Sequence, residues 1–98
     1  MVDGEGMVTV TIRYFGKVAD IVGKKSEIVG FDGSTVRDLI AFLCGKYGER
    51  MMRVLVDSDD SLREDVIILV DQKPIGGDVD TPLFDRSVVS ILPFVSGG

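Results

Sequence analysis

One segment of this sequence has the pattern of a long amphipathic helix, and it limits the folds open to the chain. Thr35 can cap the helix, and Asp38, three residues later, completes the spacing of a capping box. Gly48 stands where a left-handed C-cap would end it. Apolar residues recur between them at the three- and four-residue spacing of one helical stripe: Val36, Leu39, Ile40, Leu43 and Tyr47. The rest of the chain must supply a surface for this stripe to cover.

The segments before this helix have the pattern of β-strands. Val8 to Phe15 alternates apolar with polar residues and is rich in β-branched types, which predicts a half-buried strand. The residues expected to face the core are Val8, Val10, Ile12 and Tyr14. Gly16 ends this strand, and Lys17 to Gly23 is expected to be a connection. Ser26 to Phe31 predicts a second strand that ends at the turn Asp32-Gly33 and pairs antiparallel with the first.

The second half of the chain adds strands but no second long helix. Val66 to Val70 is an uninterrupted apolar run, which is typical of a buried strand. Asp71 to Pro74 then turns the chain. Thr81 to Phe84 is expected to form a tight helical turn, because proline suits a first helical position. Ser87 to Pro93 predicts a last strand that the proline ends.

The stretch from Glu49 to Asp65 has a weaker pattern. Met51, Met52 and Leu55 are compatible with a short helical turn, whereas residues 57–61 have the composition of a solvated loop. The acidic residues of this stretch lack the glycine and the spacing of a calcium loop. We interpret the stretch as a variable, acidic insertion.

This order of elements belongs to the α+β class, with one helix covering one face of a sheet. The β-grasp arrangement of ubiquitin satisfies it. The expectation is therefore a mixed sheet of four to five strands with one main helix across one face, and with the first and last strands side by side in parallel. The expected organisation is a flexible N-terminus over residues 1–6, a single β-grasp domain over residues 7–93 and a flexible tail over residues 94–98.

Composition excludes several classes of function. The net charge of −5 argues against nucleic acid as a direct partner. No apolar run approaches the roughly 20 residues needed to cross a bilayer, and the N-terminus lacks the pattern of an export signal, so no membrane contact is expected. With no histidine and a single cysteine, Cys44, the usual zinc sites, histidine-based triads and an internal disulfide are excluded. We expect no metal site, a cytoplasmic location, and a small buried apolar role for Cys44.

The terminal segment carries the chemistry. Fully extended, the five residues after Pro93 reach about 16 to 18 Å, enough to enter a narrow channel in another protein. Gly97 and Gly98 have no side chains, so a partner can close around them. The Gly98 carboxylate becomes reactive if an ATP-dependent enzyme adenylates it. The alternative is the ordinary frayed terminus of a structural or binding module.

Four stretches of the sequence resemble the MoaD sulfur-carrier family, and together the resemblance covers about residues 7–98. They are Tyr14-Phe15-Gly16-Lys17-Val18, Ser34-Thr35-Val36-Arg37-Asp38-Leu39, Asp80-Thr81-Pro82-Leu83 and Leu92-Pro93-Phe94-Val95-Ser96-Gly97-Gly98. The related ThiS carriers of thiazole synthesis also end in Gly-Gly. The sequence departs from the short bacterial pattern between Met51 and Asp65, where it is longer and acidic.

The resemblance implies a ubiquitin-like sulfur carrier, the non-catalytic small subunit of molybdopterin synthase and not an enzyme on its own. A ubiquitin-activating-type enzyme would use ATP to adenylate Gly98, and sulfur would replace the adenylate to give a thiocarboxylate. Val95, Ser96 and Gly97 would then enter the large synthase subunit, in a heterotetramer, and deliver the sulfur to a pterin precursor. The carrier itself would hold no permanent cofactor.

An apolar surface at the root of the tail is the predicted docking site for these partners. It consists of Phe15, Leu92, Pro93 and Phe94. The alternative for these side chains is a small second core beneath the Met51 insertion. The tail also allows other functions: sulfur transfer for tRNA thiolation or thiamine thiazole synthesis, or an isopeptide bond to lysine that would make the chain a ubiquitin-like protein modifier.

Overall fold

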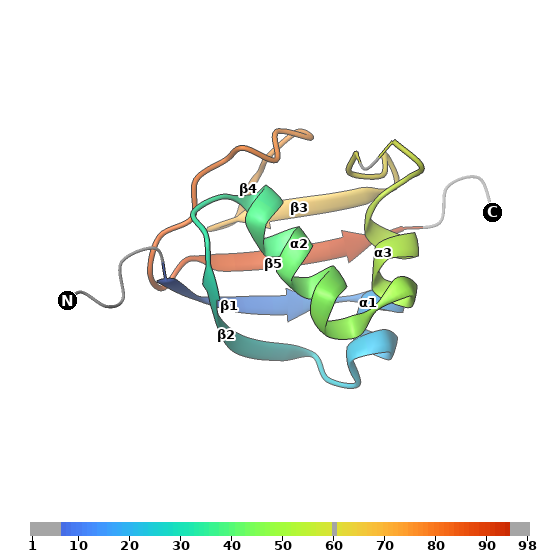
Figure 1. The fold of residues 1–98 in the computed structure, drawn as a ribbon, viewed down its shortest axis with the longest axis horizontal. Helices are drawn as coiled ribbons and strands as arrows, with labels where there is room; N and C mark the ends of the chain where they lie inside the picture. The colour runs from blue at the N-terminus through green and yellow to red at the C-terminus, as the bar shows by residue number, and fades with distance from the viewer. Residues whose placement is uncertain (1–6, 60, 95–98) are drawn as a thin grey trace.

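The computed structural model describes residues 7–59 and 61–94, which form one five-stranded sheet and three helices (Figure 1). The strands are β1 (Met7–Tyr14), β2 (Ser26–Asp32), β3 (Val66–Val70), β4 (Lys73–Pro74) and β5 (Val88–Pro93). The helices are α1 (Gly16–Val22), α2 (Val36–Tyr47) and α3 (Glu49–Leu55). The predicted flexible segment over residues 1–6 lies outside the described residues, as does the predicted tail of residues 94–98 except for Phe94.

The sheet is mixed, with the strand order β2-β1-β5-β3-β4. β1 pairs antiparallel with β2 and parallel with β5, so the first and last strands lie side by side at the centre. β5 pairs antiparallel with β3, and the two-residue β4 completes that edge. The helix α2 crosses in front of the strands in Figure 1. The β-grasp arrangement and the predicted pairing of the first and last strands are confirmed.

The start of α2 has the capping box that its sequence predicts. The Thr35 hydroxyl oxygen accepts a hydrogen bond from the Asp38 N–H at 3.3 Å, and an Asp38 carboxylate oxygen accepts one from the Thr35 N–H at 3.2 Å. These bonds satisfy two N–H groups that have no partner inside the helix. At the other end Gly48 caps the helix as predicted, and its N–H donates to the Cys44 carbonyl at 2.8 Å, but its φ of +83° and ψ of −160° lie outside the left-handed helical region. The chain enters α3 directly after it.

The core lies between α2, α3 and one face of the sheet. Val10, Ile12 and Tyr14 are buried as predicted, whereas Val8 is only half-buried at its edge. Both Met51 and Leu55 of α3 are fully buried in the same apolar cluster. The short helical turn expected at Met51, Met52 and Leu55 is therefore confirmed as α3, which completes the main core, and the described residues of the loop at 57–61 are exposed as expected.

The stretch after β1 is a helix and not the expected connection. α1 begins at Gly16 directly after Phe15, which makes no side-chain cap, and it buries Val18 completely. Gly16 itself has φ +58°, a conformation that a residue with a side chain adopts only with strain. With no capping signal and only seven residues, this helix depends on its contacts with β5 and α3.

The prediction of a helical turn at Thr81 to Phe84 is wrong. This stretch runs extended beside the start of α2, where Pro82 forms an isolated antiparallel bridge with Thr35. The Val36 N–H donates to the Thr81 carbonyl at 3.0 Å, and the Leu83 N–H donates to the Ser34 carbonyl at 2.7 Å. These long-range bonds replace the local bonds of a helical turn, and Leu83 enters the core.

Candidate functional site at the root of the tail

The parallel central strands β1 and β5 have their C-terminal ends side by side, and the tail begins at this end of the sheet. Tyr14 of β1 lies opposite Ile91 of β5. Just beyond them, a Cβ atom added to Gly16 would lie 3.5 Å from both the Cγ and the carbonyl oxygen of Pro93. The Phe94 N–H then donates to the Asp65 carbonyl at 2.9 Å. The backbone of Phe94, the first residue of the predicted tail, is thus held by the segment directly before β3.

The predicted docking residues lie around this edge. Phe15 and Leu92 follow the buried residues Tyr14 and Ile91, so alternation places both on the sheet face opposite the main core. Leu92 and Pro93 are half-buried, whereas Phe15 and Phe94 are 37% and 44% exposed.

The structure also gives Phe15 and Leu92 neighbours on that face. Leu92 pairs with Ile67, which is 43% exposed, and the Arg13 guanidinium lies 5.5 Å from the centroid of the Phe15 ring. Met51 belongs to the main core on the other face. The geometry therefore gives no support to a second core beneath Met51, and the docking role of these residues stays a prediction.

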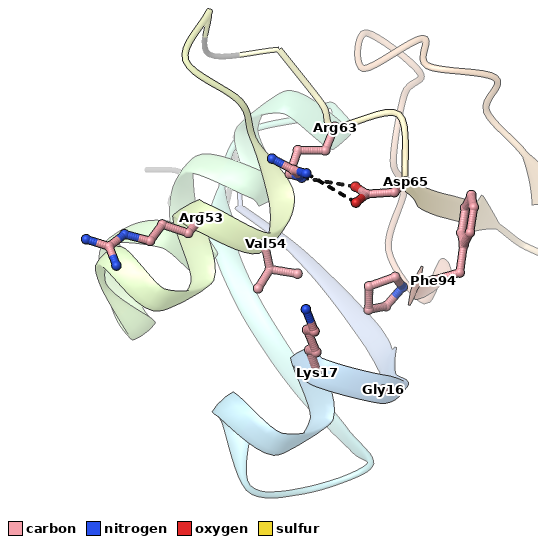
Figure 2. A pocket seen from close by; sticks show the side chains of 8 residues that line it. Gly16, Lys17, Arg53, Val54, Arg63, Asp65 and Phe94 are labelled. Atoms are coloured by element: carbon pink, nitrogen blue, oxygen red, sulfur yellow. Dashed lines mark hydrogen bonds and ion pairs between the residues drawn. The ribbon is translucent and has the colours of Figure 1, made fainter. Parts of the chain in front are cut away.

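A pocket of about 380 Å³ opens beside the root of the tail, and no local sequence pattern indicates it (Figure 2). Its lining combines the start of α1, the end of α3, the segment before β3 and the end of β5: Gly16, Lys17, Arg53, Val54, Arg63, Asp65, Pro93 and Phe94. Three of these residues are cationic and one is anionic. They are far apart in the sequence, so only the fold brings them together.

The charges in this pocket are unevenly paired. The Arg63 Nε donates to Asp65 Oδ1 at 3.0 Å, and its Nη2 donates to Oδ2 at 3.2 Å. This two-bonded contact holds the pKa of the Asp65 carboxyl below its usual value, and the nearby Lys17 ammonium lowers it further. Figure 2 shows the Lys17 side chain directed into the pocket, while the Arg53 guanidinium points outward from its rim.

The other features considered in the sequence lie away from this pocket or are not found among the described residues. Cys44 is half-buried on α2 in an apolar groove beside Met52 and Val56, and burial raises the pKa of its thiol. Over residues 7–59 and 61–94, no three side chains are grouped as metal ligands. None of the helices in that part of the chain combines the length and the apolar composition of a membrane span. The tail residues Val95, Ser96, Gly97 and Gly98 lie outside the described residues.

Comparison with protein families gives one decisive match, in which the model of the ThiS family matches residues 12–98. The chain belongs to the ThiS family. The resemblance to the MoaD and ThiS carriers is thereby confirmed, and the match extends through Gly97 and Gly98. No curated protein matches the chain significantly.

Solved structures support the same fold. The Haloferax volcanii HVO 2177 protein has a TM-score of 0.83 at 27% identity, over 100% of this chain and 93% of that one. Small archaeal modifier protein 1 from Methanosarcina acetivorans has a TM-score of 0.78 at 26% identity, over 94% and 98%. A putative molybdopterin converting factor subunit 1 from Pyrococcus furiosus has a TM-score of 0.68 at 28% identity, over 90% and 99%. The ubiquitin-like β-grasp class of this ThiS-family chain is therefore established.

Proposed function

We propose that this chain is a sulfur carrier of molybdopterin biosynthesis and that Gly98 carries the sulfur. The observation that carries this proposal is the ThiS-family match, which runs through the terminal Gly97-Gly98. The similar protein from Pyrococcus furiosus, described as a molybdopterin converting factor subunit, favours this pathway over thiazole synthesis and tRNA thiolation. The fold supports the proposal because β5 delivers the tail directly from the centre of the sheet.

The chemistry requires two steps. A carboxylate oxygen of Gly98 attacks the α-phosphorus of ATP bound by a ubiquitin-activating-type enzyme, which gives an acyl adenylate and releases pyrophosphate. Hydrosulfide or an enzyme persulfide then attacks the acyl carbon, and AMP leaves; with a persulfide, reduction of the resulting acyl disulfide by a thiol frees the thiocarboxylate. The partner enzymes supply ATP and the catalytic groups, while this chain supplies the carboxylate and the surface that positions it.

The surface that meets the partners is proposed to be the apolar edge beside the tail. Phe15 and Phe94 are exposed large apolar side chains, and Leu92 and Pro93 adjoin them. Exposed apolar patches of this kind are typical of protein interfaces. The same patch would serve the activating enzyme and the large synthase subunit in turn, since both must enclose the tail.

The test is intact mass spectrometry of the full chain after incubation with the activating enzyme from the same genome, ATP and a sulfide source. We expect a mass increase equal to the difference between a sulfur and an oxygen atom. Deletion of Gly98, or replacement of Gly97 by a bulky residue, should abolish the increase. Both changes should leave the thermal midpoint nearly unchanged, because the buried apolar residues of the described part of the chain lie between Val10 and Ile91. An unmodified mass in a system that activates a related carrier would refute the proposal.

A second function is favoured by the similarity to small archaeal modifier protein 1. In a modifier, the activated Gly98 carboxylate would form an isopeptide bond with a lysine of another protein. Recovery of lysine-linked conjugates from cells, lost when Gly98 is deleted, would show this use. Formation of molybdopterin by the thiocarboxylated carrier and the large synthase subunit would show the sulfur-carrier function. Both results together would mean that the chain serves as a carrier and as a modifier.

A further inference from the structure

The pocket at the root of the tail is cationic, although the chain as a whole has a net charge of −5. The Lys17 side chain points into it (Figure 2). Of the ion pairs formed by the described residues, none includes Lys17, whereas Arg53 and Arg63 are both paired. Both carboxylate oxygens of Asp65 already accept hydrogen bonds from Arg63. The Lys17 ammonium is therefore the charge in this pocket that an incoming anion would neutralise.

The apolar walls and the small number of unpaired charges in the pocket limit the kind of anion that can bind there. Val54, Pro93 and Phe94 give the pocket apolar walls, so a ligand that fits it joins a negative charge to an apolar group. A triphosphate has several negative charges, and it would face Asp65 with only Lys17 and the rim residue Arg53 to balance it. A single carboxylate matches the available charge better. Acidic side chains next to apolar ones, on the surface of a protein, have this chemistry.

We propose that this pocket docks an acidic side chain, presented beside an apolar one, from the activating enzyme that receives the tail. This inference rests on the proposed function and adds the recognition site. Pro93 and Phe94 line the pocket and also form the root of the tail, so a protein that encloses the tail covers the pocket as well. Lys17 is then a specificity residue, because it distinguishes an acidic partner surface from a neutral one.

The test measures ATP–pyrophosphate exchange by the activating enzyme from the same genome, with the full carrier as the varied substrate. Lys17→Glu is expected to raise the KM for the carrier roughly tenfold with little change in kcat, because charge reversal weakens encounter and docking. Lys17→Met should have a smaller effect, and added salt should raise the KM of the wild type more than that of Lys17→Met. Lys73→Glu is the matched control, since Lys73 lies exposed on the edge strand β4.

The outcomes are separable. No exchange with the wild-type carrier would remove the proposed function, and this inference with it. Exchange with equal KM values for Lys17→Glu, Lys17→Met and Lys73→Glu would overturn the docking pocket alone. A change in the KM for ATP instead of the carrier would assign the pocket to phosphate, and a concentration-dependent change of oligomeric state would assign it to a second copy. Either result would also overturn the proposal. Unchanged thermal midpoints would show that the variants fold.

Discussion

The Tyr47 hydroxyl donates a 2.6 Å hydrogen bond to Oε2 of Glu27, which ties the last residue of α2 to the second residue of β2. The Tyr14 hydroxyl donates to the same oxygen, also at 2.6 Å. Lys24 and Lys46 lie 3.4 and 3.6 Å from the other carboxylate oxygen. The Glu27 side chain is only 8% exposed, so a nearly buried charge joins β1, β2 and α2.

Loss of one of these hydrogen bonds should destabilise the fold measurably. Tyr47→Phe keeps the ring but leaves the Glu27 carboxylate with one donor fewer, and we expect the free energy of unfolding to fall by about 1 to 2 kcal/mol. Urea denaturation at neutral pH would measure it. Lys24→Gln is the control, because its exposed ion pair should contribute less than about 1 kcal/mol. Equal effects of the two variants would contradict this view of the cluster.

The same cluster predicts how stability depends on pH. Burial raises the pKa of Glu27, but the hydrogen bonds from Tyr14 and Tyr47 lower it, and nearby Lys46 and Lys24 lower it further. The net pKa lies below the ordinary value of about 4.3 for glutamate, so the folded state binds this proton less tightly than the unfolded chain. Its stabilisation is present above that value and is lost as the pH falls through the folded pKa.

Comparison of wild type with Glu27→Gln isolates this effect from the other carboxylates. The difference in free energy of unfolding should be largest near pH 7 and should shrink as the pH is lowered past 4. Urea denaturation at several pH values would measure it. A difference that grows on acidification would mean that burial dominates and that the pKa of Glu27 is raised.

The Glu27 cluster also illustrates what sequence patterns miss. Alternation correctly places Val29 and Phe31 on the core face of β2, but it places the charged Glu27 there too. Its partners come from 13 residues earlier and 20 residues later in the chain, and no local rule connects them. By contrast, the capping box of α2 is a contact between residues three apart, which is why the sequence predicted it.

Contacts between residues far apart in the sequence also explain what the sequence patterns missed at the candidate site. The tail was evident because its chemistry lies in consecutive residues, but the pocket combines Lys17 with Arg63 and Pro93. The helix α1 was missed because its seven residues are too few to show an apolar stripe. Pro82 suits a helix start locally, yet its bridge to Thr35 decides its conformation. There the long-range pairing overrides the local propensity.

Two glycines near α2 should respond in opposite ways to alanine. Gly45 lies inside the helix, and a Cβ added there would meet nothing within 4 Å, so Gly45→Ala should stabilise the protein by about 0.5 to 1 kcal/mol. A Cβ on Gly33 would overlap the Cβ of Asp38, so Gly33→Ala must displace the capping carboxylate and lower the thermal midpoint. Thermal denaturation of both variants would measure this. Midpoints shifted in the same direction would contradict it.

Cys44 should be dispensable for sulfur transfer. Burial raises the pKa of its thiol, so little thiolate is present at neutral pH. We expect Cys44→Ala to form the Gly98 thiocarboxylate at the wild-type rate in the mass assay, and the native thiol to react with iodoacetamide more slowly than free cysteine. A Cys44→Ala carrier that is adenylated but gains no sulfur would show that this thiol relays sulfur.

Phe15 should contribute to partner binding much more than to stability. Its ring is 37% exposed at the edge where β1 ends, beside the root of the tail. If that edge is the docking surface, Phe15→Ala should weaken binding of the large synthase subunit by about 1 to 2 kcal/mol, or roughly 5- to 30-fold, as truncation of an aromatic anchor does. Isothermal titration calorimetry with the full-length chain would measure the affinity.

The matched control for Phe15 is Ile28→Ala. Ile28 lies on the same uncovered face of the sheet and is more exposed, at 72%, but it belongs to the edge strand β2. It should leave the affinity unchanged, because the tail leaves from the far side of β1. Equal loss of affinity in both variants would mean that the partner covers the whole sheet face, and unchanged affinity in Phe15→Ala would remove Phe15 from the interface.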